Sequence, residues 1–177
     1  MKITKIKQMI ICIVGIILLV CLDQMAKMWA ETSLKFNGPI VLIDGVLELF
    51  YLPNGNTGAA FGMLQGHQSL FLIIALVISA LLLLIIYKIP LEKRYNPLVI
   101  TLCLIIAGGI GNMIDRFNLN YVIDFIYFSL INFPIFNVAD MYVSVGTIVL
   151  VLLMLFYYKE EDISLIEKSI KSYFIKK

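Results

Sequence analysis

The chain has 177 residues, of which 61% are hydrophobic and 15% are charged, and its formal net charge is +2. Soluble domains are about 45–50% apolar, so this composition excludes a protein whose surface is mostly covered by water. The length allows one membrane-embedded domain, expected to cover residues 1–177. The small net charge says nothing about nucleic acid, and we expect no nucleic-acid partner.

Four apolar segments are long enough to cross a bilayer, which requires about 20 mostly apolar residues in a helix. In chain order they cover approximately residues 8–30, 69–87, 97–116 and 137–158. This pattern predicts an all-α membrane protein with four transmembrane helices.

The first segment could also be a secretory signal, because it has a basic start followed by an apolar stretch. It reaches Cys21 as a lipoprotein signal would, but Val20 stands before this cysteine where a small residue is needed. The stretch DQMAK (23–27) then continues at helical spacing, and further apolar segments follow. We therefore expect the first segment to remain as an uncleaved helix.

Lysine and arginine residues indicate the orientation, because they are enriched on the cytoplasmic side of membrane proteins. With four crossings, the N-terminus, the loop at 88–94 and the tail 159–177 share one side, and all are lysine-rich. The other side retains only Lys27, Lys35 and Arg116. Both termini and the charged tail are therefore expected in the cytoplasm.

Two outer segments, residues 31–68 and 117–136, connect the helices on the opposite side. The first contains GVLELFYL (45–52), and the second is also apolar and rich in residues that favour strands. A fifth crossing through the second segment would put the lysine-rich tail outside, and Asp124 and Pro134 interrupt it. We expect both segments to form a small sheet at the outer interface.

Polar side chains from several parts of the chain converge at one depth, near the outer ends of the expected helices. They are Asp23, Lys27, Asn56, Asn112, Asp115, Arg116, Asp124, Asn137 and Asp140. Structural explanations exist for several of them. Lys27 is a candidate ion-pair partner of Asp23, one turn away. Arg116 can pair with the adjacent Asp115, and Asn137 can cap the fourth helix.

Asp124 and Asp140 have no basic residue beside them in the sequence. Each lies in apolar sequence, and a chain that returns from the outer sheet to the fourth helix could bring the two acids together. Two close carboxyl groups can share one proton, so that one activates water while the other polarises a carbonyl, as in aspartic proteases. The sequence permits this geometry without establishing it. The chain's one histidine, His67, has no second histidine with which to build a metal site.

At these residues the chain resembles the bacterial lipoprotein signal peptidases, also called signal peptidase II. Each stretch is weak evidence alone, but five of them occur in the family's order on the expected side of the membrane. They are DQMAK (23–27), NTGAAFG (56–62), GGIGNMIDR (108–116), VIDF (122–125) and FNVAD (136–140).

The resemblance implies a membrane-embedded aspartic endopeptidase that needs no metal or other cofactor. It implies four transmembrane helices with an outer β-cradle and a short interfacial helix, in the bacterial cell membrane, with the active site toward the outer face. The implied reaction is cleavage of a prolipoprotein on the N-terminal side of a cysteine that carries diacylglycerol. Globomycin-type peptides are the implied inhibitors, membrane lipid surrounds the site, and we expect a monomer.

The resemblance also assigns roles to residues. Asp124 and Asp140 are the implied catalytic dyad. The residues implied to bind substrate or support the site are Asp23, Lys27, Asn56, Asn112, Arg116 and Asn137. We further expect Gly58, Ala59 and Ala60 to line a narrow pocket, because residues beside a lipidated cysteine must be small to fit.

Two other hypotheses compete with the peptidase. A small ion-coupled or proton-coupled transporter would use residues such as Asp23 and Lys27 as a relay, but the inner halves of the helices lack acids and bases. A non-catalytic scaffold would use the polar groups to hold helices together. In a scaffold, Asp124→Asn or Asp140→Asn would alter stability more than any activity.

Overall fold

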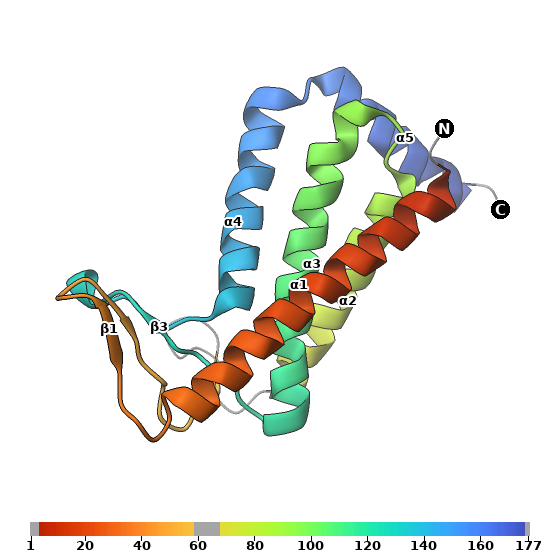
Figure 1. The fold of residues 1–177 in the computed structure, drawn as a ribbon. Helices are drawn as coiled ribbons and strands as arrows, with labels where there is room; N and C mark the ends of the chain where they lie inside the picture. The colour runs from red at the N-terminus through yellow and green to blue at the C-terminus, as the bar shows by residue number, and fades with distance from the viewer. Residues whose placement is uncertain (1–3, 59–67, 176–177) are drawn as a thin grey trace.

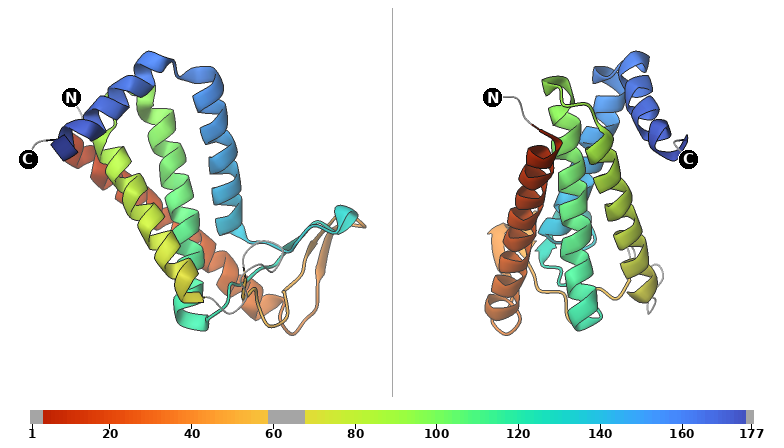
Figure 2. Two further views of the ribbon diagram at one scale, coloured as in Figure 1. Left: turned by 180° about the vertical axis from the view of Figure 1, so that it is seen from behind. Right: turned by 90° about the vertical axis from the view of Figure 1, so that its right-hand side faces the viewer.

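Helices make up most of the computed structural model, which describes residues 4–58 and 68–175. Their bounds are Lys5–Ser33 for α1, Gln68–Lys88 for α2, Asn96–Leu119 for α3, Val138–Leu152 for α4 and Glu160–Ile175 for α5. The first four stand side by side, and α5 lies across one end of them (Figures 1 and 2). A π-helical turn, Leu153–Tyr157, extends α4 toward α5.

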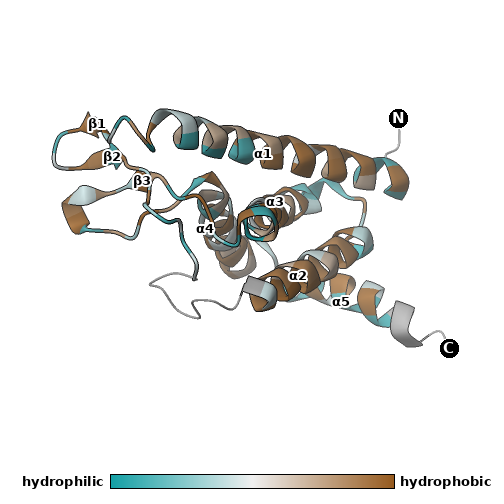
Figure 3. Ribbon diagram, turned by 90° about the horizontal axis from the view of Figure 1, so that it is seen from below, coloured by the Kyte–Doolittle hydropathy of each residue, from teal (hydrophilic) through white to brown (hydrophobic). Residues whose placement is uncertain are grey.

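Within the described residues, four helices are long and apolar enough to cross a membrane, which confirms the predicted fold class. These spans are Lys5–Ser33, Ser69–Lys88, Lys93–Leu119 and Val138–Tyr157. Hydrophobic residues cover most of their surfaces (Figure 3), as expected where lipid replaces water. We call the end of the bundle that carries the strands the sheet end, and the end crossed by α5 the tail end.

A three-stranded antiparallel sheet in the order β1-β2-β3 lies at the sheet end, and both outer segments contribute to it as predicted. Its strands are Ile40–Ile43, Leu47–Leu49 and Ile126–Tyr127. Isolated bridges join Asn56 to Val122 and Ile126 to Phe136. These bridges hold the loop that carries Asn56 beside the loop that carries Asp124.

Less of the second outer segment is strand than the sequence predicts. Helix α3 continues to Leu119, where Asn120 ends it in the left-handed conformation with φ of 63°. A short 3-10 turn, Ser129–Ile131, follows β3. The rest of the first outer segment, residues 59–67, lies outside the described residues, and this range includes the predicted pocket residues Ala59 and Ala60.

Helix α3 is the central helix and packs against α1, α2 and α4. Near the tail end, a core of side chains from these helices includes Ile16, Ile86, Leu102 and Ile106. A second core lies under the sheet and is formed by Ala30, Leu34, Tyr51, Ile123 and Phe125. Because Ile123 and Phe125 are both anchored in this second core, the backbone of Asp124 between them is fixed.

Gly108 allows α3 and α4 to approach closely, and replacing it should destabilise the protein. A Cβ atom at this position would lie 2.4 Å from the backbone oxygen of Ala139 and 2.6 Å from a methyl group of Val143. We expect Gly108→Ala to lower the free energy of unfolding by about 1–3 kcal/mol, because the helices must move apart. Thermal unfolding in detergent would measure this loss.

The matched control is Gly15→Ala on α1, where nothing lies within 4 Å of an added Cβ atom. This change should leave stability equal or slightly higher, because alanine favours the helix more than glycine does. Equal stability of the two variants would contradict the close approach of α3 and α4.

Candidate active site

A cavity of about 890 Å³ opens at the sheet end, between α3, α4 and the loops of the outer segments. Its polar wall contains Asn56, Gly58, Asn112, Arg116 and Asp140. The remaining wall is largely apolar, and includes Phe71, Phe128, Phe133, Phe136, Met141 and Val143. The cavity therefore combines an apolar chamber with hydrogen-bonding groups on one side.

Asp140 lies in the first turn of α4, and a capping box fixes its side chain. The Asn137 side-chain oxygen accepts the backbone N–H of Asp140 at 2.9 Å, and Asp140 Oδ2 accepts the backbone N–H of Asn137 at 3.1 Å. The other carboxyl oxygen, Oδ1, accepts a hydrogen bond of 2.7 Å from the Asn112 amide. Asp140 is thus held at the cavity wall by both α4 and α3.

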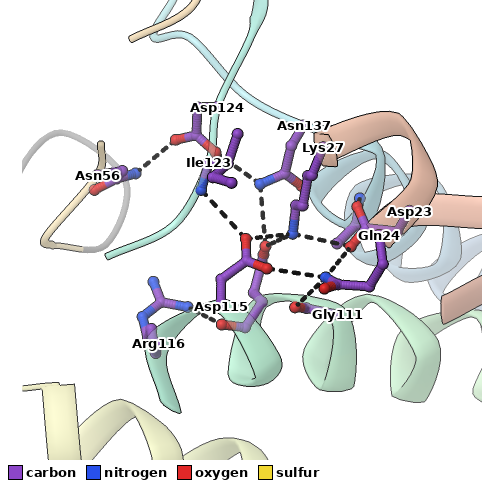
Figure 4. A network of polar contacts seen from close by, with 12 residues as sticks. Asp23, Gln24, Lys27, Asn56, Gly111, Asp115, Arg116, Ile123, Asp124 and Asn137 are labelled. Carbon is purple, nitrogen blue, oxygen red and sulfur yellow. Dashed lines mark hydrogen bonds and ion pairs between the residues drawn. The ribbon is translucent and has the colours of Figure 1, made fainter. Parts of the chain in front are cut away.

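Asp124 is almost fully buried, with 1% of its surface exposed, and lies on the loop between α3 and β3. Its Oδ1 accepts a hydrogen bond of 2.7 Å from the Asn137 amide, and its Oδ2 accepts one of 2.9 Å from the Asn56 amide (Figure 4). Asn137 therefore contacts both acids. It caps α4, as predicted, and the same side chain also joins Asp140 to Asp124.

Burial raises the pKa of Asp124 to about 7, and the negative charge of nearby Asp140 adds to this increase. The hydrogen bonds from Asn56 and Asn137, and the positive charge of Lys27, act in the opposite direction. Asp124 can consequently hold a proton near neutral pH, which an exposed aspartic acid cannot do.

Groups that can only donate fix the orientation of the amides around the acids. The Lys27 ammonium donates to Asn112 Oδ1 at 3.0 Å, so the Asn112 NH₂ group must face Asp140. The backbone N–H of Gly58 donates to Asn56 Oδ1 at 3.0 Å, so the Asn56 NH₂ group must face Asp124. As a result, every carboxyl oxygen of the two acids accepts one hydrogen bond.

A buried ion cluster lies directly behind these amides (Figure 4). The Lys27 ammonium is 2.9 Å from Asp23 Oδ2 and 2.8 Å from Asp115 Oδ2, and all three side chains are at most 3% exposed. The predicted pair of Asp23 with Lys27 is therefore present. The predicted pairing of Asp115 with Arg116 is wrong, because the basic partner of Asp115 comes from α1.

Hydrogen bonds connect the ion cluster to the rest of the site. Asp23 Oδ1 accepts the backbone N–H of Ala139 at 2.8 Å, beside Asp140 at the start of α4. Asp115 Oδ2 accepts the backbone N–H of Ile123 at 3.2 Å, beside Asp124. Each acid of the cluster thus holds the backbone next to one of the two candidate catalytic acids.

Gln24 is a site residue that the sequence reasoning missed. Its amide NH₂ donates to Asp115 Oδ1 at 2.9 Å, to Asp23 Oδ2 at 3.2 Å and to the backbone oxygen of Gly111 at 3.2 Å. A polar amide next to an acid inside an apolar segment was a signal that could have identified it. Gln24 ties α1 to α3 across the ion cluster.

Comparison with known proteins assigns the family. A family model described as signal peptidase (SPase) II matches residues 15–156. The chain belongs to the signal peptidase II family. Lipoprotein signal peptidases from Streptococcus thermophilus strain CNRZ 1066 and Streptococcus pyogenes serotype M5 strain Manfredo are 43% and 41% identical over 150 residues. The match covers 84% and 85% of this chain, and 93% and 94% of those proteins.

Solved structures have the same fold. A bacterial membrane enzyme determined at 2.3 Å resolution has a TM-score of 0.72 and 30% sequence identity to this chain, with 84% of this chain and 92% of that chain covered. A second, determined at 1.9 Å, has a TM-score of 0.70 and 30% identity, with 83% and 94% covered. The family identifies this chain as a peptidase, which favours that hypothesis over the transporter and the scaffold.

Arg116 lines the signal peptidase II cavity. One guanidinium nitrogen donates to the backbone oxygen of Gly58 at 3.0 Å, and another donates to the backbone oxygen of Asn112 at 3.4 Å. Its guanidinium carbon lies 4.8 Å from the centre of the Phe71 ring. Arg116 therefore joins α3 to the loop of Asn56, and Gly58 lines the cavity.

No three His, Cys, Asp or Glu side chains in the described parts of this signal peptidase are grouped closely enough to hold a metal ion. The predicted site residues that the structure describes are joined in one network of hydrogen bonds and ion pairs. Ala60 lies outside the described residues.

Proposed function

We propose that the chain is an intramembrane aspartic endopeptidase that removes the signal peptide from diacylglyceryl-modified prolipoproteins, cutting on the N-terminal side of the lipidated cysteine. We propose further that residues 1–177 act as one peptidase unit. The observation that carries this proposal is that Asn137 contacts both Asp124 and Asp140 at a large, mostly apolar cavity.

In this mechanism, Asp124 and Asp140 share one proton. The protonated acid donates a hydrogen bond to the scissile carbonyl, and the ionised acid takes a proton from the attacking water. The raised pKa of Asp124 supports Asp124 as the protonated member at neutral pH. Because Asp124 lies behind Asn56, substrate reaches it when the Asn56 hydrogen bond is exchanged for one to the substrate.

The cavity walls suggest how the substrate lies. The aromatic side chains of Phe128, Phe133 and Phe136 pack on one another and offer an apolar surface for the diacylglyceryl group. Arg116 and Asn112, on the opposite wall, can donate hydrogen bonds to the extended substrate backbone. Globomycin-type peptides would inhibit by occupying the same cavity. We further propose that the active form is a monomer.

The charge distribution supports an orientation in the bacterial cell membrane. Basic residues gather at the tail end, in α5, at Lys88 where α2 ends, and at Lys93 and Arg94 before α3. By the positive-inside rule we place the tail end in the cytoplasm and the sheet end at the outer face. The cavity then lies at the depth where a signal peptide leaves the membrane and where water can enter from outside.

The direct test is cleavage of a diacylglyceryl-modified prolipoprotein by the purified full chain in lipid nanodiscs. Mass spectrometry of the products should place the cut immediately before the lipidated cysteine. The matched control is the same precursor without the lipid, which should be cut at least about 100-fold more slowly because it lacks the group that fills the apolar chamber. Equal cleavage of both precursors, or a cut elsewhere, would contradict the proposal.

The rate of cleavage should fall as the pH rises through about 7. Burial raises the pKa of Asp124 to about 7, so above this pH the pair loses the proton that polarises the carbonyl. Initial rates of cleavage between about pH 5 and 9 would measure this decrease. The hydrogen bond from Asn56 lowers the pKa of Asp124, so Asn56→Ala should raise this pKa. The fall in the cleavage rate of Asn56→Ala should therefore occur at higher pH. A rate that increases through pH 7 would assign the proton differently.

A further inference from the structure

Helix α5 is a feature that the peptidase chemistry does not use. The family match ends at residue 156, and α5 begins at Glu160. The last membrane span ends at Tyr157, so α5 starts only three residues beyond it. The helix then lies across the tail end of the bundle and runs beside the end of α2 (Figures 1 and 2).

A polar and aromatic hinge fixes the direction of α5. Tyr158 has an extended backbone that breaks the helix, and its hydroxyl donates to the backbone oxygen of Arg94 at 3.1 Å. The Arg94 guanidinium donates to Asp162 Oδ2 at 2.5 Å, and the backbone N–H of Lys159 donates to the same oxygen at 2.9 Å. Tyr95 stacks on Tyr158 with ring centres 5.7 Å apart. These contacts set α5 at the end of the bundle instead of along the axis of α4.

The hinge also sets the depth of α5. Tyrosine side chains gather at the boundary between the hydrocarbon and the head groups of a membrane. Tyr157 is 45% exposed at the tail end of the spans and packs on Tyr158, with Arg94 over the Tyr157 ring at 5.4 Å, while Tyr95 and Tyr158 are buried beside it. A helix that starts directly after these tyrosines begins at the level of the lipid head groups.

The two faces of α5 differ in chemistry. Ile166 and Ile170 lie on one face and are half-buried, and Ile166 packs on the core of the bundle. Ile163 and Leu165 flank this face and remain 43% and 49% exposed. The exposed polar face carries Lys168, among others. The bundle thus covers only part of the apolar surface of α5, and the rest of this surface lies at the edge of the bilayer.

Charge is divided along the helix. Its first turns carry the acids Glu160, Glu161 and Asp162, near the hinge and Arg94. From residue 168 onward the sequence contains lysines and no acids, namely Lys168, Lys171, Lys176 and Lys177. Helix α5 as a whole holds four acids and two lysines, but its C-terminal part and the residues after it are basic. A basic amphipathic segment at this depth matches a surface of negatively charged lipid head groups.

We propose that α5 is a membrane-surface helix that docks on anionic phospholipid head groups at the tail end of the bundle. Lys168 and Lys171 contact the head groups, while Ile163 and Leu165 enter the boundary between head groups and acyl chains. The hinge at Arg94 and Asp162 holds the helix in place for this contact. The inference concerns a surface far from the cavity and does not depend on the proposed cleavage reaction.

The test is hydrogen exchange of the amides of residues 160–175 in the full chain. The protein is placed in nanodiscs of phosphatidylcholine alone, or with about one third phosphatidylglycerol. Each lysine near an anionic surface shifts docking by about fivefold, so Lys168→Gln with Lys171→Gln should remove about 25-fold of the protection gained from phosphatidylglycerol. High salt should remove the same protection, because it screens these charges.

The matched control is Glu167→Gln. Lys171 pairs with Glu167 one turn away, so both the double lysine variant and Glu167→Gln break this ion pair. Only the lysine variant removes positive charge, and Glu167→Gln should keep or increase the protection by phosphatidylglycerol. Equal loss of protection in the double lysine variant and in Glu167→Gln would mean that the broken ion pair weakens the helix, and would contradict lipid docking. Equal exchange of the unaltered protein in the two nanodiscs would also overturn the proposal, and would leave the exposed face for a protein partner.

Discussion

Asp124→Asn and Asp140→Asn should each reduce cleavage of a lipidated prolipoprotein by at least about 10³-fold while the protein stays folded. Asparagine has nearly the same shape as aspartic acid but can neither take a proton from water nor hold a shared one. Each variant should also lose some folding stability, because both oxygens of each acid accept hydrogen bonds. An asparagine can accept only one of the two, so each variant should lose about 1–2 kcal/mol of stability.

The measurement pairs the rate of cleavage with thermal unfolding of the same preparation. Asp44→Asn is the matched control, because Asp44 lies in the turn between β1 and β2 and is exposed at the same end of the molecule. This control should retain full activity and stability. A folded Asp140→Asn protein that still cleaves would remove Asp140 from the chemistry, and the same reasoning applies to Asp124.

The sequence predicted the helices because they depend on strong local signals, whereas it only permitted the two acids to meet. Long apolar segments specify membrane helices, and acids within such segments must be held by other protein groups. The role of Asn137 was predicted only in part. Its position before α4 indicates a cap, but its contact with Asp124 depends on the return path of the loop after α3, which local sequence does not specify.

The errors have equally specific causes. Asp115 was paired with Arg116 because the two are adjacent, but neighbouring residues on a helix point in directions about 100° apart. Asp115 faces α1 and meets Lys27, whereas Arg116 faces the loop of Gly58. The tail was predicted only as a charged segment. Its direction is set by contacts of Asp162 with Arg94, which lie 68 residues apart in the sequence.

Lys27→Met should destabilise the protein more than either aspartate variant, by about 3–5 kcal/mol, because it leaves Asp23 and Asp115 buried without a positive charge. It should also lower cleavage, because the Asn112 oxygen loses one of its two donors, Lys27, and only the Asn137 amide still holds the Asn112 side chain toward Asp140. The matched control is Lys35→Met. Lys35, just after the end of α1, forms an ion pair with Glu31 at the same spacing, but both side chains are 36% exposed, so little stability should be lost.

A second change separates the structural role of Lys27 from its effect on the site. Combining Lys27→Met with Asp115→Asn returns the charge of the buried cluster to its original value of −1, so part of the stability should be recovered. Cleavage should remain low, because neither change restores the Lys27 ammonium to the Asn112 oxygen, which then keeps only the Asn137 amide as a donor. If cleavage instead recovers in proportion to stability, Lys27 serves only to hold the helices together. If stability recovers and cleavage does not, Lys27 positions the hydrogen bond that keeps Asp140 ready to accept a proton.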